Sequence, residues 1–260
     1  AIRHFHKKNL KIGHAGTLDP LATGLLLVCI GKATKMAETL QSHDKEYIAG
    51  ITFGATTPSY DLEKEIDRHF PYGHITENAI RDALEKFIGE QDQVAPLFSA
   101  KSVDGTRAYE LARKLLKEKA SGKQGNPDGP ADFDTAAEKL IRTARIRINS
   151  LELLSFWQKG TPDNEKSKDK APEGNASSRI NVTDNSALGL PSAKIRISCS
   201  KGTYVRAFAR DLGEELGSGA YLDSLVRSKS GDFDIKDALT IEQAIGILAA
   251  VSKMLVTAGG

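Results

Sequence analysis

The stretch from Lys11 to Lys35 reads KIGHAGTLDPLATGLLLVCIGKATK and contains a single acid, Asp19. Glycines and a proline surround this aspartate, so its backbone is unlikely to be regular helix or strand. The run LLLVCI that follows is short, apolar and closed by Gly31, which predicts a buried strand from Leu25 to Ile30. We therefore expect a lone carboxylate on a tight loop anchored to the core, a good position for a reactive group.

The segment GHAGTLDPLATGLL within this stretch resembles the signature of the bacterial TruB-like pseudouridine synthases, the tRNA pseudouridine(55) synthase family. The resemblance implies that Asp19 is the catalytic aspartate, which detaches uracil from its ribose so that the base rotates and rejoins through carbon. Taken alone, Asp-Pro indicates only a turn. A carboxylate suits the reaction because it is anionic at neutral pH and can add to an electrophilic carbon. Attack on the pyrimidine ring and attack on the ribose both remain open.

The segment CSKGTYVRAFARDLGEELGSGAYLDSLVR, from Cys199 to Arg227, resembles the second long signature of the family. By this resemblance Arg206 pairs with the catalytic acid. A carboxylate that a substrate base shields from water needs an opposite charge nearby to stay ionised, and the planar guanidinium is suited to grip it. The alternative is a surface arginine at a helix start, where the helix dipole disfavours a cation.

Tyr47 lies in KEYIAGITF, residues 45–53, and matches a family tyrosine that stacks on the target base and takes part in proton transfer. Without the resemblance, a tyrosine in a strand is more often a packing residue. Leu225 matches a leucine of the uracil pocket, where it would desolvate the base. An ordinary core leucine is the alternative interpretation.

Further candidates for substrate binding surround this core set. The family places the residue matching His14 against the RNA loop, and Tyr204 is expected to line the same pocket two residues before Arg206. Lys201 and Lys101 are candidate phosphate contacts, although lysines are solvated surface charges by default. His14 and Asp19 could bind a metal, but they lack a third ligand, so we expect no metal and no cofactor.

The composition is that of an ordinary soluble globular protein, with 260 residues, 40% apolar and 27% charged. The net charge of +2 does not by itself indicate a nucleic-acid partner, but Ala1 to Leu18 is basic and carries no acid. Cys29 and Cys199 are expected to be buried free thiols, with a disulfide as the alternative. No apolar run is long enough to span a membrane, so we expect a cytoplasmic protein.

Strand-like and helical segments occur without regular alternation, which favours an α+β fold. The resemblance implies the pseudouridine synthase fold, a central mixed, mostly antiparallel sheet with helices and loops around an RNA-binding cleft. The residue pattern predicts strands over 45–53, 141–156 and 194–200, a loop over 56–69, helices over 33–40, 76–88 and 205–216, and a last helix begun by Thr240 and Gln243.

We expect residues 1–260 to form a single catalytic domain. Residues 95–116 resemble the mobile thumb of the family and contain a hairpin signal at Asp104-Gly105. Two low-complexity stretches, 117–135 and 159–192, are expected to be surface insertions. Ala1 to Leu10 is expected to end an amphipathic helix. The first strand of the family has no match here, and an accessory C-terminal RNA-binding domain is not expected.

The resemblance makes tRNA the expected partner, with a uridine in its T-arm loop flipped out of the stack, and a monomer the expected state. Three rival interpretations remain. An RNA-guided synthase of ribosomal RNA fits the residues after Asp19-Pro20 less well. A non-catalytic tRNA-binding or tRNA-folding scaffold would not need a nucleophile together with Tyr47 and Arg206. An aspartate-based phosphotransferase would require a second acid beside Asp19.

Overall fold

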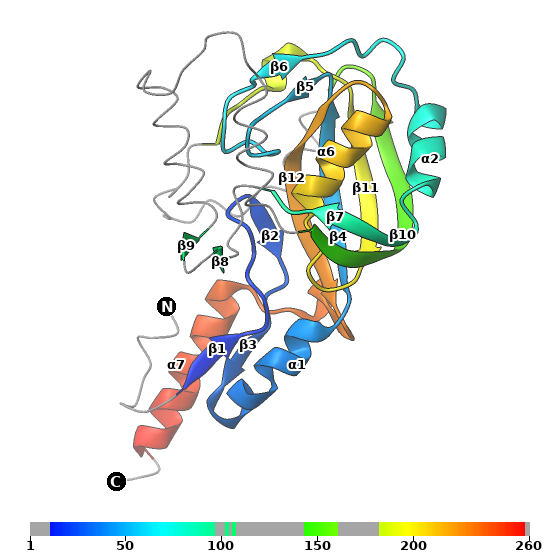
Figure 1. The fold of residues 1–260 in the computed structure, drawn as a ribbon. Coiled ribbons are helices and arrows are strands. Elements are labelled where there is room, and N and C mark those ends of the chain that lie inside the picture. Colours follow the sequence, from blue (N-terminus) through cyan, green and yellow to red (C-terminus); the bar gives the residue numbers. More distant parts are fainter. Residues whose placement is uncertain (1–10, 97–101, 104–105, 108–142, 161–181, 258–260) are drawn as a thin grey trace.

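The computed structural model describes residues 11–96, 102–103, 106–107, 143–160 and 182–257. Its centre is one sheet (Figure 1) whose strands, in spatial order, are β13 (Phe233–Asp234), β12 (Ala220–Ser230), β4 (Lys45–Phe53), β11 (Ser192–Cys199), β10 (Thr143–Trp157) and β7 (Gly89–Val94). All these neighbours pair antiparallel, whereas β2 (Ala22–Gly24) pairs in parallel with β12. The expected central mixed, mostly antiparallel sheet is therefore confirmed.

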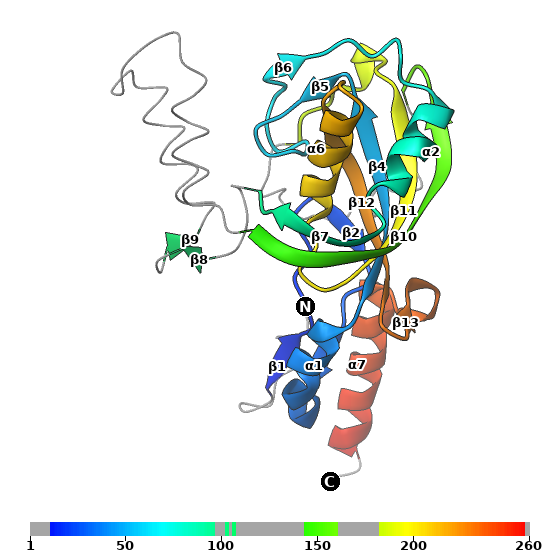
Figure 2. The same ribbon diagram turned by 45° about the vertical axis from the view of Figure 1, so that its right-hand side comes forward.

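Two helices, α2 (Glu77–Glu85) and α6 (Val205–Glu215), lie on the same face of the sheet (Figures 1 and 2). The amide of Ala79 donates to the side chain of Thr76 over 3.2 Å, which confirms the predicted N-cap of α2. The ring of Phe208 on α6 meets that of Phe87 edge to face with centroids 5.5 Å apart. The apolar faces of both helices and the inner side of the sheet form the main core.

The run from Leu25 to Ile30 is not the buried strand that its composition predicts. Leu25 is buried, but only Val28–Ile30 forms a strand, β3, and it pairs with β1 (Ile12–His14) in a separate two-stranded ribbon. Val28 and Ile30 are each 40% exposed because the ribbon has no third strand among the described residues, while Cys29 between them is buried. Apolar composition alone cannot distinguish a ribbon of this kind from a core strand.

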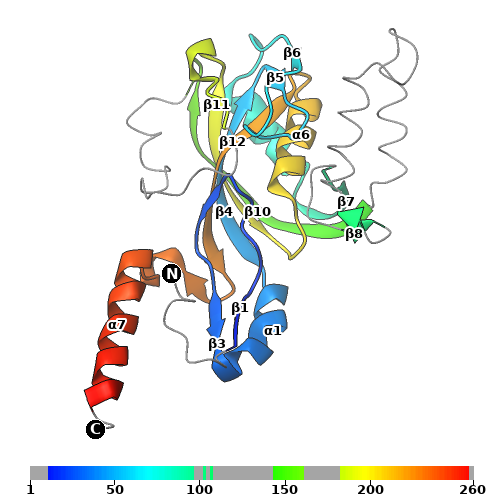
Figure 3. The same ribbon diagram turned by 90° about the vertical axis from the view of Figure 1, so that its left-hand side faces the viewer.

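The ribbon, α1 (Ala37–Ser42) and α7 (Ile241–Thr257) project from one end of the sheet (Figure 3). The predicted helix over 33–40 begins as a 3-10 segment, η2 (Gly31–Met36), before α1. The capping box of α7 is confirmed, since Gln243 N donates to Thr240 Oγ1 and Thr240 N donates to Gln243 Oε1. The expected core face of α7, namely Ala244, Ile245 and Leu248, is only half-buried.

The remaining segments include some that the sequence pattern did not identify and one hairpin that it did. The sequence pattern did not identify β12, although it lies inside the sheet, nor the edge strand β7. Within the predicted loop 56–69, β6 (Arg68–His69) pairs with β5 (Ala55–Thr56). The strands β8 (Ser102–Val103) and β9 (Thr106–Arg107) pair on either side of Asp104-Gly105, as that hairpin signal predicts. The chain also contains η4 (Ile235–Asp237).

The stretch expected to be a surface insertion over 159–192 ends earlier than predicted. Residues 182–192 include η3 (Ser186–Leu188), and Leu190 is buried in a small cluster with Ala55 and Tyr221. The amide of Thr183 donates to Leu62 O over 2.9 Å, which ties this segment to the body. The N-terminal segment, most of the thumb, the stretch 117–135 and Lys101 lie outside the described residues. Within the described residues, no helix is both long and apolar enough to cross a bilayer.

Candidate active site

Asp19 lies at the tip of the β1–β3 ribbon, where the two strands separate into a wide loop. The last rung of the ribbon is the bond from Ala15 N to Leu27 O, and beyond it Ala22 N donates to Asp19 O over 2.8 Å to close a turn. The loop continues into β2, which lies along β12 in the central sheet. The side chain of Asp19 is 39% exposed, so the carboxylate is accessible although its backbone is tied to the sheet.

Arg206, the second residue of α6, supplies the cation for this carboxylate. Its Nε donates to Asp19 Oδ2 over 3.1 Å, and its side chain is only 6% exposed. The predicted pairing of Asp19 with Arg206 is thus confirmed as a contact. Because the guanidinium is buried and the carboxylate is not, the cation is held on the protein side and leaves an approach to Asp19 from solvent.

A second carboxylate, Asp61, contacts the same guanidinium and was not identified from the sequence. Arg206 Nη1 lies 3.5 Å from Asp61 Oδ2, and the side chain of Asp61 is as buried as that of Arg206. Asp61 Oδ1 also accepts the amide of Glu63 over 2.9 Å. Tyr60, just before Asp61, has φ of 58°, a left-handed conformation that is uncommon for a residue with a side chain. This strained turn directs Asp61 against Arg206.

Gln93 on β7 fixes the start of the helix that carries Arg206. Its amide accepts from Tyr204 N over 2.8 Å and donates to Tyr204 O over 3.1 Å, so both backbone groups of the N-cap residue are satisfied. Gln93 is 3% exposed, which makes this contact part of the interior. Gln93 is thus a positioning contact that the polar pattern of β7 did not reveal, while the expected place of Tyr204 in the substrate pocket stays a prediction.

Tyr47 lies at the centre of the sheet on β4, opposite Ile197 of β11 and Arg227 of β12. Burial raises the pKa of the Tyr47 hydroxyl above its ordinary value, while the nearby charge and hydrogen bond of Arg227 lower it and the charge of Asp19 raises it. The Tyr47 hydroxyl is therefore neutral at physiological pH and within electrostatic range of Asp19. Leu225 is 6% exposed on β12, between Ala22 and Ala49 in the register.

Comparison with known proteins adds the second line of evidence. Residues 3–124 match the family described as TruB family pseudouridylate synthase (N terminal domain). The chain is 44% identical over 235 residues to a protein of Phocaeicola vulgatus named tRNA pseudouridine synthase B, covering 90% of this chain and 77% of the relative. It is 42% identical to the protein of that name from Bacteroides thetaiotaomicron, and the match covers 92% of this chain and 80% of that relative. This chain belongs to the TruB family of pseudouridylate synthases.

The chain also resembles a chain in a solved structure of a Cbf5-Nop10-Gar1 complex, with 22% sequence identity and a TM-score of 0.48. The matched region covers 86% of this chain and 41% of the other one. Membership of the TruB family gives the chain the pseudouridine synthase fold that the sequence resemblance implied. The two signature segments of this TruB family chain lie side by side in space, because β2 and β12 pair and because Asp19 contacts Arg206.

Two of the remaining expected residues are exposed. His14 ends β1, and Lys201 lies in the turn between β11 and α6. Among the observed hydrogen bonds and ion pairs of the described residues, none joins either side chain to Asp19. Their roles toward RNA stay predictions, as does that of Lys101. Cys29 and Cys199 are both buried and free, as expected. Among the described residues, no group of three or more His, Cys, Asp or Glu side chains is arranged to hold a metal ion.

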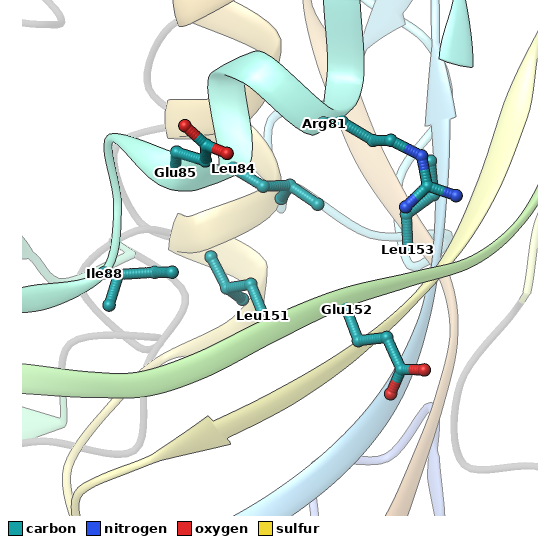
Figure 4. A pocket seen from close by; sticks show the side chains of 7 residues that line it. All are labelled: Arg81, Leu84, Glu85, Ile88, Leu151, Glu152 and Leu153. Atoms are coloured by element: carbon teal, nitrogen blue, oxygen red, sulfur yellow. The ribbon is translucent and has the colours of Figure 1, made fainter. Parts of the chain in front are cut away.

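A hollow that Asp19 does not line lies between α2 and β10 (Figure 4). Its lining mixes apolar and charged side chains, namely Arg81, Leu84, Glu85, Ile88, Leu151, Glu152 and Leu153. None of these residues belongs to the signature segments, and the RNA-binding cleft expected beside Asp19 stays a prediction.

Proposed function

We propose that this TruB family enzyme converts a uridine in the T-arm loop of tRNA, position 55, to pseudouridine without a cofactor. The observation that carries the proposal is the accessible carboxylate of Asp19 held against a buried guanidinium, itself braced by Asp61. The relatives named tRNA pseudouridine synthase B support tRNA as the substrate. Asp19 is the proposed nucleophile, Arg206 its charge partner and Tyr47 the side chain against the base.

The proposed reaction is an isomerisation and needs no oxidant or reductant. The bond between ribose C1′ and uracil N1 breaks, and a bond between C1′ and C5 forms. The C5 hydrogen leaves as a proton, and N1 gains one, so atoms and electrons balance. Asp19 forms a transient covalent bond with an electrophilic carbon of the substrate and is released at the end of the cycle.

The side chains around Asp19 fit the demands of this reaction. A base must leave the RNA stack before a carboxylate can reach it, at a cost of a few kcal/mol. Leu225, the ring of Tyr47 and Tyr204 are the proposed apolar surface that would replace the lost stacking. Arg206 already faces Asp19 and does not have to reorganise when the base excludes water. His14, Lys201 and Lys101 are the proposed contacts to the RNA loop and its phosphates.

The test is incubation of the protein with an unmodified tRNA transcript, followed by mapping of pseudouridine. We expect product at the T-loop uridine with the wild type and none with Asp19→Ala. A matched control is Asp82→Asn, which alters an exposed aspartate on α2 and should behave as the wild type. A transcript carrying cytidine at the target position should yield no product.

The outcomes separate the alternatives. Equal tRNA binding without product from either protein would favour the non-catalytic scaffold. Product only after addition of a guide RNA would favour an RNA-guided synthase. We also propose that the enzyme acts as a monomer in the cytoplasm, which light scattering after size-exclusion chromatography and cell fractionation would test.

A further inference from the structure

Arg227 is a second buried arginine near the proposed site, and the reaction as derived above does not use it. It lies on β12 and is 2% exposed. Its guanidinium contacts the Asp19 loop on both sides of the aspartate, since Nε donates to Leu25 O over 2.7 Å and Nη1 donates to Thr17 O over 3.4 Å. One rigid, planar group thus holds two carbonyl oxygens that are eight residues apart in the chain.

The backbone of the loop is shaped around this arginine. Leu25 N donates to Arg227 O over 2.9 Å, next to the parallel pairing of β2 with β12. Gly24 has φ of +99°, and a Cβ at that position would lie 2.5 Å from Arg227 O, so only glycine permits this approach. A Cβ on Gly16 would lie 3.7 Å from Arg227 Nη1. The backbone of the first signature segment, which contains Asp19, therefore packs closely against Arg227, the last residue of the second signature segment.

The same arginine also lies beside the side chain proposed to face the base. Arg227 is the direct partner of Tyr47 across the β4–β12 ladder, and it is close enough to counteract the rise that burial causes in the pKa of the Tyr47 hydroxyl. The neighbouring Lys45 is 7% exposed, and burial together with the charge of Arg227 lowers its pKa. Arg227 is therefore a charged group in the interior, where replacing it changes electrostatics as well as packing.

We propose that Arg227 is a positioning residue that sets the distance between the Asp19 turn and the Tyr47 hydroxyl. The turn and the tyrosine come from different elements, and Arg227 bonds to the first and is the cross-strand partner of the second. This inference rests on the proposed function, in which Asp19 and Tyr47 act on one base. A merely structural arginine would stabilise the sheet without linking the effects of these two groups.

The test combines kinetics with a measurement that does not depend on activity. Under single-turnover conditions, Arg227→Met should lower the rate about 100-fold, because a displacement of about 1 Å has that effect on catalysis, while the affinity for tRNA changes little. In a Tyr47→Phe background, Arg227→Met should lower the single-turnover rate only about tenfold, since the part of its effect that acts through the Tyr47 hydroxyl is already lost. Hydrogen exchange in the peptide covering residues 17–25 should become faster in Arg227→Met without a global loss of protection.

The matched control is Arg196→Met, which removes a partly exposed arginine of β11 paired with Glu152 and should leave both measurements unchanged. Arg227→Lys keeps the charge without the planar fork and should lower the rate about tenfold, which preserves the test if the methionine variant does not fold. Equal rate losses in the tyrosine and phenylalanine backgrounds, or unchanged exchange over residues 17–25, would overturn the proposal. A wild type that forms no pseudouridine would instead overturn the proposed function, and the exchange data would still decide whether Arg227 holds the turn.

Discussion

Two buried arginines lie in neighbouring regions of the molecule, and one pairs with charged carboxylates whereas the other bonds to neutral backbone carbonyls. Arg206, at the start of α6, contacts the carboxylates of Asp19 and Asp61. Arg227, near the end of β12, donates to the carbonyls of Thr17 and Leu25 and is the cross-strand partner of Tyr47. The first arrangement sets the charge around the proposed nucleophile, and the second sets its position. Replacing each arginine should therefore give a different combination of lost stability and lost activity.

The largest effect is expected for Arg206→Met. Loss of the preorganised cation beside Asp19 should lower the single-turnover rate by about 10² to 10³-fold. Asp61 would remain buried without a cation, so the free energy of unfolding should fall by about 3 to 5 kcal/mol. Urea denaturation followed by circular dichroism measures the second effect.

The control for this variant is Arg81→Met, which removes an exposed arginine that pairs with Glu77 on α2. Its unfolding free energy should change by less than about 1 kcal/mol because exposed ion pairs contribute little. Arg206→Met with wild-type stability would contradict the buried pair between Arg206 and Asp61.

Asp61→Asn should reduce activity less than Arg206→Met does. The amide keeps the shape and can still accept the Glu63 N–H, but it no longer attracts the guanidinium, so Arg206 loses its brace. We expect the rate to fall by about 10- to 100-fold with the affinity for tRNA nearly unchanged. Asp67→Asn is the matched control, because Asp67 belongs to the same loop and its exposed side chain accepts only the Thr56 hydroxyl among the side-chain contacts observed. Equal rates for the two variants would remove Asp61 from the site.

The two regions also show what the sequence could and could not predict. Asp19, Arg206 and Tyr47 were found because they stand in long signature segments, and local patterns identified β4, α6 and the caps at Thr76 and Thr240. Asp61 was missed because an aspartate in a polar loop looks like a turn residue. Its burial becomes understandable only when the chain brings a guanidinium to it.

Long-range pairing explains the other errors. The strand β12 mixes apolar and polar residues without clear alternation, so the pattern did not reveal it, and Arg227 near its end received no role. The run Leu25 to Ile30 looked like a core strand, but the sheet takes in only the preceding β2. Local patterns specify elements well, whereas their partners depend on the whole fold.

Substitution of Gln93, which bonds to the start of the helix that carries Arg206, should lower stability less than Arg206→Met does. Gln93→Leu would leave the backbone N–H of Tyr204 without the Gln93 acceptor, whereas Tyr204 O keeps its bond from Phe208 N, and the unfolding free energy should fall by about 1 to 3 kcal/mol. Gln93→Glu keeps the acceptor for Tyr204 N but buries a charge and replaces the donor to Tyr204 O by an oxygen, so this variant should also lose stability. The rates of both variants should lie below that of the wild type. A leucine variant as active and stable as the wild type would show that α6 does not need this contact.

The last prediction concerns stability alone, at alkaline pH. Burial raises the pKa of the Cys199 thiol from its ordinary value of 9.0 to about 11. The folded state holds this proton more tightly than the unfolded state, so its contribution is complete below pH 9 and is lost as the pH rises toward 11. This loss amounts to about 2 to 3 kcal/mol.

Cys199→Ala should therefore lose less stability than the wild type between pH 9 and 11, as measured by urea denaturation at several pH values. Burial also raises the pKa of Tyr47 and Tyr221, but these groups are present in both proteins, so the difference isolates the thiol. Parallel curves for the two proteins would contradict the assignment.

The most direct measurement is single-turnover release of tritium from a tRNA transcript labelled at C5 of uridine, because that hydrogen must leave when C5 bonds to the ribose. The wild type should release tritium in step with pseudouridine formation at the T-loop uridine. Asp19→Asn should bind the transcript with similar affinity and release it at least about 10³-fold more slowly. Release by Asp19→Asn within about tenfold of the wild-type rate would show that the carboxylate held by Arg206 is not the nucleophile.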